Sequence, residues 1–215
     1  MATHYDEEAE LEQLRRWWRE NRLPLVAGLA LGLAAIFGWQ AWRAHRDARA
    51  AEASHLYEDL DKATALRKLD DATQMGERLE QDYADTPYAG VAALKLAQIA
   101  AAQNKFDEAR KHLAWAAEHA KDPELRPLAR LRLAQILWQL NKPQEALQQL
   151  QGDPGSYAEL YDELRGDIEL ATGDRAAARA AYEQALKALG KEETTAREGL
   201  QRKLDDLAVA APETR

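Results

Sequence analysis

The pattern of hydrophobic and polar positions changes abruptly near the N-terminus, where charged residues disappear for twenty positions. The run Leu23–Trp42 reads LPLVAGLALGLAAIFGWQAW and carries no charged side chain. At 1.5 Å per residue, a helix of this length spans the roughly 30 Å hydrocarbon core of a bilayer. Its apolar character surrounds the whole helix, whereas a surface helix of a soluble domain has one apolar stripe. The pattern therefore predicts a transmembrane helix at residues 23–42.

The flanks of this apolar run support the membrane interpretation over two alternatives. Tryptophan favours the membrane–water interface, and four tryptophans are the expected interface anchors: Trp17, Trp18, Trp39 and Trp42. A buried core helix is one alternative, but it does not explain an apolar surface on every side. A cleaved signal peptide is the other, with an apolar region of about 7–15 residues. The run is longer, and the nearest A-x-A pattern lies beyond Arg43 and Arg46, so we expect an uncleaved anchor.

The arginines on either side of the run favour a cytoplasmic N-terminus only slightly. Four arginines lie within residues 15–22 and three within residues 43–49. Basic residues are enriched on the cytoplasmic side of a membrane span. We therefore expect a cytoplasmic tail at residues 1–22 ahead of the span, although charge alone does not fix the orientation.

Small residues share one face of the predicted span, at Gly28, Gly32 and Ala35. Helices in lipid associate through close packing, and small side chains at this spacing let a second helix approach. The pattern thus predicts a packing face for a partner helix. Glycine and alanine are also common in membrane helices that have no partner, and this alternative stays open.

Beyond the span, hydrophobic positions recur as pairs of helices joined by similar turns. Four stretches align, RKLDDA, NKFDEA, NKPQEA and GDRAAA, and they end at the repeat-turn alanines Ala72, Ala109, Ala146 and Ala178. These alanines lie 37, 37 and 32 residues apart, close to the 34-residue tetratricopeptide period. A small side chain there lets the two helices cross closely. One such hairpin cannot bury its apolar face alone, so we expect an all-α solenoid of stacked hairpins over residues 43–208.

Local signals set the expected helix boundaries. Thr86-Pro87 predicts a helix start, because threonine caps helices and proline suits the first helical position. A turn at residues 103–105 should end that helix, and Asp122-Pro123 predicts the next start in the same way. The second helix of the third repeat should be short, ending near Gln151. A last helix at Lys191–Ala208 is expected to cap the array through Ala196, Leu200, Leu204 and Leu207, with a flexible tail at 209–215.

Composition narrows the classes of function. The net charge of −8 argues against a nucleic-acid-binding protein, which normally presents a basic face. The chain has no cysteine, which excludes disulfides and a thiol nucleophile but leaves the compartment open. We therefore expect the lipid bilayer and other proteins, rather than nucleic acid, as partners.

Taken together, these parts resemble the YfgM-type family of ancillary SecYEG translocon subunits of Gram-negative bacteria. The resemblance rests on the stretches YDEEAELEQLRRWWREN and DYADTPYAGVAALKLA, the Trp-flanked span, a helix at Ala44–Leu66 and the degenerate repeats. It implies a single-pass type II protein of the cell inner membrane, with its N-terminus cytoplasmic and its repeats periplasmic. It also implies association with the SecYEG translocon and with a membrane-anchored periplasmic chaperone of the prolyl-isomerase-like class. Members of the family are thought to help newly exported proteins reach periplasmic chaperones, and the family has no catalytic residues.

Candidate chemistry is sparse. His112 and His119 lie two helical turns apart, but no third ligand is evident and no HExxH motif occurs. Adjacent acids such as Asp70 and Asp71 point about 100° apart on a helix and do not converge. Phosphate-binding loops and GxSxG elbows are also missing. We expect no catalytic, cofactor-binding or metal site, and an enzyme with a concealed site is the least favoured of three hypotheses.

The surface of the repeats is the remaining candidate for function. Aromatic residues are enriched at binding hot spots, and the candidates here are Tyr88, Trp115, Tyr157, Tyr161 and Tyr182. Packing between repeats is the favoured interpretation for each one taken singly. The leading hypothesis is a membrane-anchored repeat adaptor of the Sec translocon. The alternative is a membrane-tethered repeat scaffold for envelope assembly or cell division.

Overall fold

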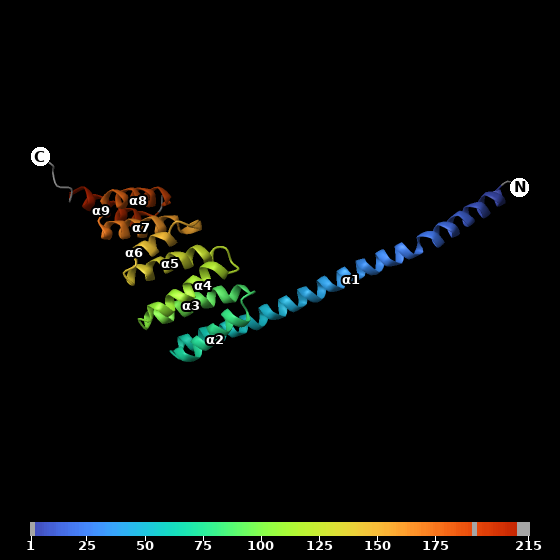
Figure 1. Cartoon of the computed structure of the whole chain (residues 1–215), viewed down its shortest axis with the longest axis horizontal. Helices are drawn as coiled ribbons and strands as arrows, with labels where there is room; N and C mark the ends of the chain where they lie inside the picture. Colours follow the sequence, from blue (N-terminus) through green and yellow to red (C-terminus); the bar gives the residue numbers. More distant parts are fainter. Residues whose placement is uncertain (1–2, 191–192, 210–215) are drawn as a thin grey trace. The chain divides into compact units, whose positions relative to one another are not determined.

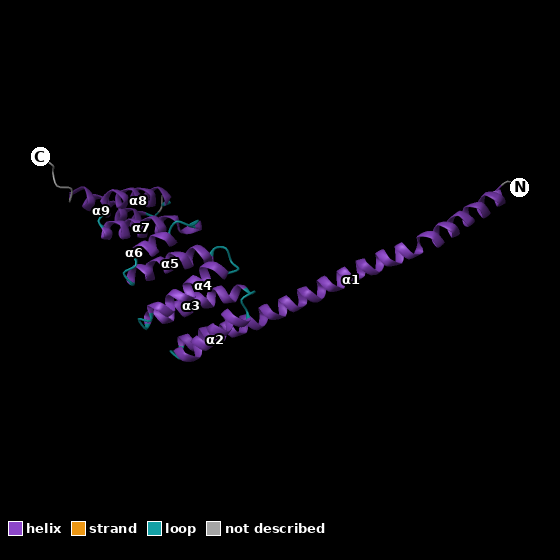
Figure 2. Ribbon diagram, in the orientation of Figure 1, coloured by secondary structure: helices purple, strands orange, loops and turns teal. Residues whose placement is uncertain are grey.

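The computed structural model describes residues 3–190 and 193–209, and within these ranges the chain forms helices and turns without a strand (Figure 2). The all-α class expected from the sequence is confirmed. The chain divides into two compact units, an N-terminal unit that ends at Arg49 and a repeat unit that begins at Ala50. The boundary falls inside the first helix, α1 (Thr3–Ala65).

The N-terminal unit consists of the first part of α1. Every side chain from Arg22 to Ala48 is exposed, including all those of the apolar run. The helix begins well before Leu23 and continues beyond Trp42, so neither end of the run is a helix end. Pro24 lies inside the helix, where its ring cannot donate the hydrogen bond that the carbonyl of Glu20 would accept. An exposed apolar surface of this length is the arrangement that lipid, rather than water, favours.

The repeat unit begins with residues 50–65 of α1 and continues as helical hairpins that follow one another in chain order (Figure 1). Its further elements are α2 (Leu69–Asp82), α3 (Pro87–Ala102), α4 (Phe106–His119), α5 (Leu125–Gln139), α6 (Pro143–Gln149), η1 (Gly155–Tyr157), α7 (Ala158–Thr172), α8 (Arg175–Ala188) and α9 (Thr194–Val209). The hairpins also pack on the helices that follow them, since α4 contacts α5 and α8 contacts α9.

The four hairpin turns share one backbone feature. Arg67, Asn104, Asn141 and Gly173 all have positive φ, from 57° to 96°, and each stands at the head of one of the four aligned stretches. The left-handed conformation reverses the chain after the first helix of the hairpin. The repeat-turn alanine lies five residues after the turn residue in each repeat. All four repeat-turn alanines are 0 % exposed.

Small and medium apolar side chains fill the space between the helices. One cluster runs from α3 to α7 and includes Leu113, Leu137 and Ile168. Residues 50–65 of α1 join the array through Leu60, which packs with Leu79 of α2 and Ala92 of α3. At the other end, α8 and α9 share a separate cluster around Tyr182 and Leu200. The core is therefore distributed along the stack, as expected when each repeat contacts its neighbours.

The local signals predicted most helix starts but not that of α5. The helix predicted from Thr86-Pro87 begins at Pro87, although the Thr86 hydroxyl donates to the carbonyl of Tyr83 and not to an amide of the helix. The start expected at Asp122-Pro123 is wrong, since α5 begins at Leu125. The carboxylate of Asp122 accepts a bond from the amide of Glu124 at 2.9 Å, and this local turn competes with the helix.

The C-terminal boundaries also differ from the expectation. Helix α6 is short and ends at Gln149, two residues before the predicted end. Helix α9 begins at Thr194 rather than at Lys191, which lies outside the described residues. Leu200 and Leu207 are buried and Leu204 is half-buried, but Ala196 is exposed, so the predicted capping face starts one turn later. Residues 210–215 of the predicted tail also lie outside the described residues.

Candidate interaction site

The predicted packing face of the span is sterically open. A Cβ atom added to Gly28 or Gly32 would meet nothing within 4 Å, and Ala35 is likewise exposed on α1. Among the described residues, no atom therefore occupies the space beside Gly28 and Gly32 that a partner helix would fill. The role of these three residues in docking remains a prediction.

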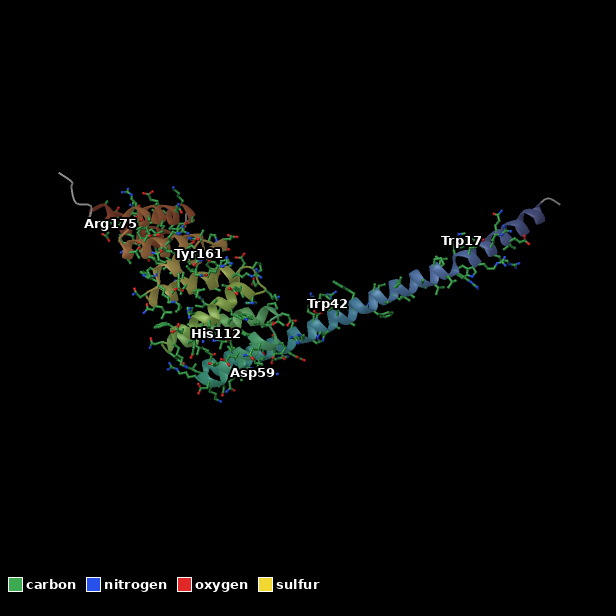
Figure 3. All side chains as sticks on the ribbon, viewed as in Figure 1. Trp17, Trp42, Asp59, His112, Tyr161 and Arg175 are labelled. Carbon is green, nitrogen blue, oxygen red and sulfur yellow. The ribbon has the colours of Figure 1, made fainter. Side chains whose placement is uncertain are left out.

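The four tryptophans lie on α1 at the two ends of the apolar run, as Trp17 and Trp42 show in Figure 3. All four are exposed. The rings of Trp39 and Trp42 are 5.1 Å apart, and the guanidinium of Arg46 lies 5.0 Å from the centre of the Trp42 ring. A cation beside aromatic rings suits the boundary between lipid and water.

The repeat unit contains a groove between α3 and α5, which we call the α3–α5 groove. It has a volume of about 240 Å³ and is lined by Leu94, Ala97, Gln98, Ala101, Leu113, Arg132, Gln135 and Ile136. The lining is mostly apolar, with Gln98, Arg132 and Gln135 exposed to solvent. Sites for drug-sized molecules usually measure about 300–1,000 Å³. This groove is smaller, and its size suits one or two side chains of a polypeptide.

A second, polar groove of about 580 Å³ lies between α2 and α4. His112 borders it, and its Nδ1 is 2.9 Å from a carboxylate oxygen of Glu80 on α2. Opposite charges are mixed along this groove, with Asp70 and Glu77 on α2 and Lys111 on α4. Because three carboxylates and two lysines alternate along it, the groove presents no continuous surface of one sign to a charged ligand.

His112 and His119, whose spacing in the sequence raised the question of a shared metal ion, have separate partners. His112 contacts Glu80, whereas Nδ1 of His119 lies 3.1 Å from the carbonyl of Trp115 and its ring stacks on that indole. Figure 3 shows His112 on the body of the repeats. Within residues 3–190 and 193–209, no group of three or more potential ligands is placed to hold a metal ion. His112 thus links α4 to α2, whereas the exposed His119 contacts Trp115 on its own helix.

Burial decides between the two interpretations of the candidate aromatic residues. Tyr161 and Tyr182 are each 1 % exposed, so they pack between helices and do not form a binding surface. The Tyr161 hydroxyl donates to the carbonyl of Pro127, and the Tyr182 hydroxyl donates to the carboxylate of Asp167. Burial raises the pKa of Tyr161 to about 12 and also raises the pKa of Tyr182. The other three, Tyr88, Trp115 and Tyr157, are half-buried.

An ionic cluster that sequence patterns did not reveal attaches α9 to α7. The ammonium of Lys203 donates to Glu163 at 2.7 Å and to Asp167 at 2.6 Å. Burial alone lowers the pKa of Lys203, but its hydrogen bonds with the two carboxylates outweigh this effect and raise it. Arg175, at the start of α8, donates to the carbonyl of Leu207 near the end of α9. These contacts make α9 the last layer of the described stack.

Comparison with known proteins gives consistent results along the chain. Residues 15–209 match the family model described as a tetratricopeptide repeat-like domain. The chain is 33 % identical over 187 residues to the ancillary SecYEG translocon subunit of Haemophilus influenzae, covering 86 % of this chain and 91 % of the relative. It is 30 % identical over 188 residues to the ancillary SecYEG translocon subunit of Escherichia coli, covering 87 % and 90 %. The corresponding protein of Neisseria gonorrhoeae is 28 % identical over 209 residues, covering 96 % and 100 %.

Among solved structures, MamA protein has a similar fold, with a TM-score of 0.51 and 19 % identity. The match covers 74 % of this chain and 92 % of MamA. At this level of identity the likeness concerns the fold alone, and it agrees with a stack of helical hairpins.

Proposed function

The chain belongs to the family of ancillary SecYEG translocon subunits, and we propose that it is a membrane-anchored adaptor that associates with the Sec translocon. The observation that carries the proposal is the extent of the similarity: relatives align with 86 % and 87 % of the chain, and the family-model match at residues 15–209 includes both the apolar helix and the repeats. The function is one of binding and positioning, so no catalytic residue is assigned.

The proposed topology is a single-pass type II protein of the cell inner membrane. Residues 1–22 form the cytoplasmic tail, residues 23–42 span the bilayer, and the repeats from residue 43 onward lie in the periplasm. The exposed apolar surface of α1 and the slight excess of arginine before the span support this arrangement. The repeats help newly exported proteins to reach a membrane-anchored periplasmic chaperone of the prolyl-isomerase-like class.

Tethering explains how such an adaptor functions with weak individual contacts. A helix that docks beside partner helices through Gly28 and Gly32 keeps the repeats near the translocon. The second contact, between the repeats and a polypeptide, then forms at a high effective concentration. Two weak contacts combine into useful avidity, while the exported protein still dissociates readily from each.

The first test is photocrosslinking in native inner membranes. A photoreactive amino acid is placed at Leu29 in the span or at Gln98 in the α3–α5 groove, with exposed Arg179 on α8 as a control position. The adducts are identified by mass spectrometry. Adducts of the span with translocon subunits, and of the groove with a periplasmic chaperone or an exported protein, support the proposal. Adducts mainly with division or cell-wall proteins would replace it with the scaffold alternative.

A second test addresses the packing face of the span. Replacing Gly28 and Gly32 with leucine should lower the recovery of translocon subunits with the purified chain, because the larger side chains separate the helices. Ala30→Leu and Ala34→Leu place two leucines at the same spacing on the opposite side of the helix and serve as the matched control. Equal recovery from both double variants would remove docking from the Gly28–Gly32 face.

A further inference from the structure

Basic side chains occupy equivalent places on the first helices of two consecutive repeats, α3 and α5. Lys95 on α3 and Arg132 on α5 each lie fourteen residues before the repeat-turn alanine of their own repeat. A different position, eleven residues before the repeat-turn alanine, holds Asp61 on α1, Gln98 on α3, Gln135 on α5 and Asp167 on α7. In two cases, a basic residue meets the acid at this position across the next-but-one helix: Lys95 meets Asp61, and Lys203 of α9, which lies beyond the aligned repeats, meets Asp167.

The first case is Lys95, whose ammonium lies 2.9 Å from the carboxylate of Asp61. The hydrogen bond with Asp61 raises the pKa of Lys95, so the two charges neutralise each other where α1 and α3 meet. The second is Lys203 of α9, which pairs with Asp167 and Glu163 of α7. Both ends of the repeat unit are thus closed by ion pairs between alternate helices.

Arg132 is different because α3, the corresponding helix of the preceding repeat, carries no acidic residue. The position that corresponds to Asp61 is Gln98, a neutral amide. Both Arg132 and Gln98 line the α3–α5 groove and both are exposed. Within the described part of the chain, Arg132 forms no ion pair. The middle of the stack therefore holds a positive charge whose equivalent in the preceding repeat, Lys95, is already neutralised by Asp61.

Two amide side chains add hydrogen-bonding groups to the same place. Gln98 and Gln135 occupy the same position in consecutive repeats, eleven residues before Ala109 and Ala146. Each carries two N–H donors and one carbonyl acceptor, which are the groups that complement a peptide bond. A helical ligand uses its own backbone groups internally, so these glutamines suit an extended segment. The apolar floor, with Ala97 and Ala101, takes a side chain next to that backbone.

We propose that the α3–α5 groove binds an extended polypeptide segment that carries an apolar side chain next to an acidic one. The apolar side chain fills the groove, the carboxylate pairs with Arg132, and the backbone bonds to Gln98 and Gln135. The carboxylate takes the place that Asp61 holds beside Lys95. This inference rests on the proposed function, because it identifies the site and the sequence type of the polypeptide that the repeats hold.

The test measures peptide binding to the full-length chain in nonionic-detergent micelles by fluorescence anisotropy. The probe is a capped, labelled decapeptide of glycine and serine in which two leucines flank one glutamate. Its twin has glutamine in place of the glutamate. The wild-type chain should bind the glutamate peptide roughly three- to tenfold more tightly than the twin, as expected for a charge-assisted contact at a partly exposed site.

Arg132→Gln should make the two affinities equal without changing the affinity for the glutamine twin. The matched control is the double variant Asp61→Asn with Lys95→Gln, which removes the neighbouring ion pair at constant net charge and should keep the preference. Ala101→Phe should weaken binding of both peptides, because the ring fills the groove. Circular dichroism checks that each variant retains its helix content.

The inference would be overturned by equal binding of the twins to the wild type, by a preference that survives Arg132→Gln, or by displacement of the peptide when free glutamate is added at the peptide's own concentration. The last would show a site for small anions. Failure to bind either peptide, with crosslinks from Leu29 to the translocon intact, would also reject this groove while leaving the proposed function standing. Loss of those crosslinks rejects the proposed function separately.

Discussion

Residues 22–48 and residues 50–65 belong to one helix, α1, yet their apolar side chains have different surroundings. In the first stretch every side chain is exposed. In the second, Ala53 and Leu60 are 0 % exposed and pack against α2 and α3. The first stretch gains stability only where lipid surrounds it, whereas the second gains it from the protein itself. The difference shows that a continuous helix can depend on two solvents.

Removing the first stretch is the strongest way to test this division. A fragment that begins at Ala44 should remain soluble without detergent and keep the helical circular-dichroism spectrum of the repeats. The reason is that the buried clusters of the repeat unit lie beyond Arg49. The full-length chain, prepared in parallel, should require detergent or lipid. Aggregation of the fragment, or a disordered spectrum, would show that the repeats need the N-terminal unit.

Truncating one leucine in each stretch should give the next largest difference. Leu60→Ala should lower the free energy of unfolding of the repeats by about 2–5 kcal/mol, because it leaves a cavity between α1, α2 and α3. Leu29→Ala, in the exposed stretch, should leave that free energy unchanged. Urea titrations of both variants in the same detergent, followed by circular dichroism, make the comparison. Equal destabilisation would contradict the division of α1.

Alkaline pH should weaken the repeats because Tyr161 holds its proton more tightly when folded. Its pKa is about 12 in the folded chain and 10.0 in the reference state. The contribution is therefore fully present below pH 10 and is lost as the pH rises toward 12, amounting to about 3 kcal/mol. Urea titrations between pH 8 and 11.5 measure the decline. Tyr161→Phe should make it shallower, and an unchanged slope would show that Tyr161 is not its source.

Glycine substitutions should give a smaller contrast. A Cβ at Gly166 would overlap the ring of Tyr182, which a bond to Asp167 holds in place. Gly166→Ala should therefore destabilise the repeats by about 1–3 kcal/mol. Gly28→Ala meets open space and should have no effect on repeat unfolding. Thermal unfolding of the two variants tests this, with Gly199→Ala as an unobstructed control in α9; a neutral Gly166→Ala would mean that the Tyr182 ring moves aside.

The fold was predictable from the sequence where a short local pattern determines the structure. Three of the four turns follow from stretches that start with asparagine or glycine, which favour positive φ, and end in a repeat-turn alanine, as in Asn104 to Ala109; the first stretch starts with Arg67, whose positive φ its residue type does not predict. The start of α5 was not predictable in this way. Asp122-Pro123 pairs a capping residue with proline just as Thr86-Pro87 does, yet α5 begins at Leu125 and not at the proline. What decides the outcome is the bond from the amide of Glu124 to the Asp122 carboxylate.

The candidate site was less predictable, since it depends on which helices become neighbours. Tyr161 is buried against α5, where its hydroxyl donates to the carbonyl of Pro127, more than thirty residues earlier in the chain. The α3–α5 groove likewise requires two helices from different repeats. One signal was present in the sequence: counting back from each repeat-turn alanine places Gln98 where the first repeat has Asp61. That comparison marks Arg132 as a cation lacking the acidic counterpart of Lys95.

The stacked order of the hairpins also has a consequence for how the chain folds. Helices in extensive contact are consecutive along the described chain, as with α3 and α4 or α7 and α8, and next-but-one helices such as α5 and α7 touch only slightly. Chains with such local contacts generally fold fast, because little loop closure precedes each stabilising contact. A hairpin therefore need not wait for distant segments to be synthesised. Folding of the repeats can begin near α1 and proceed toward α9 while the ribosome is still completing the chain.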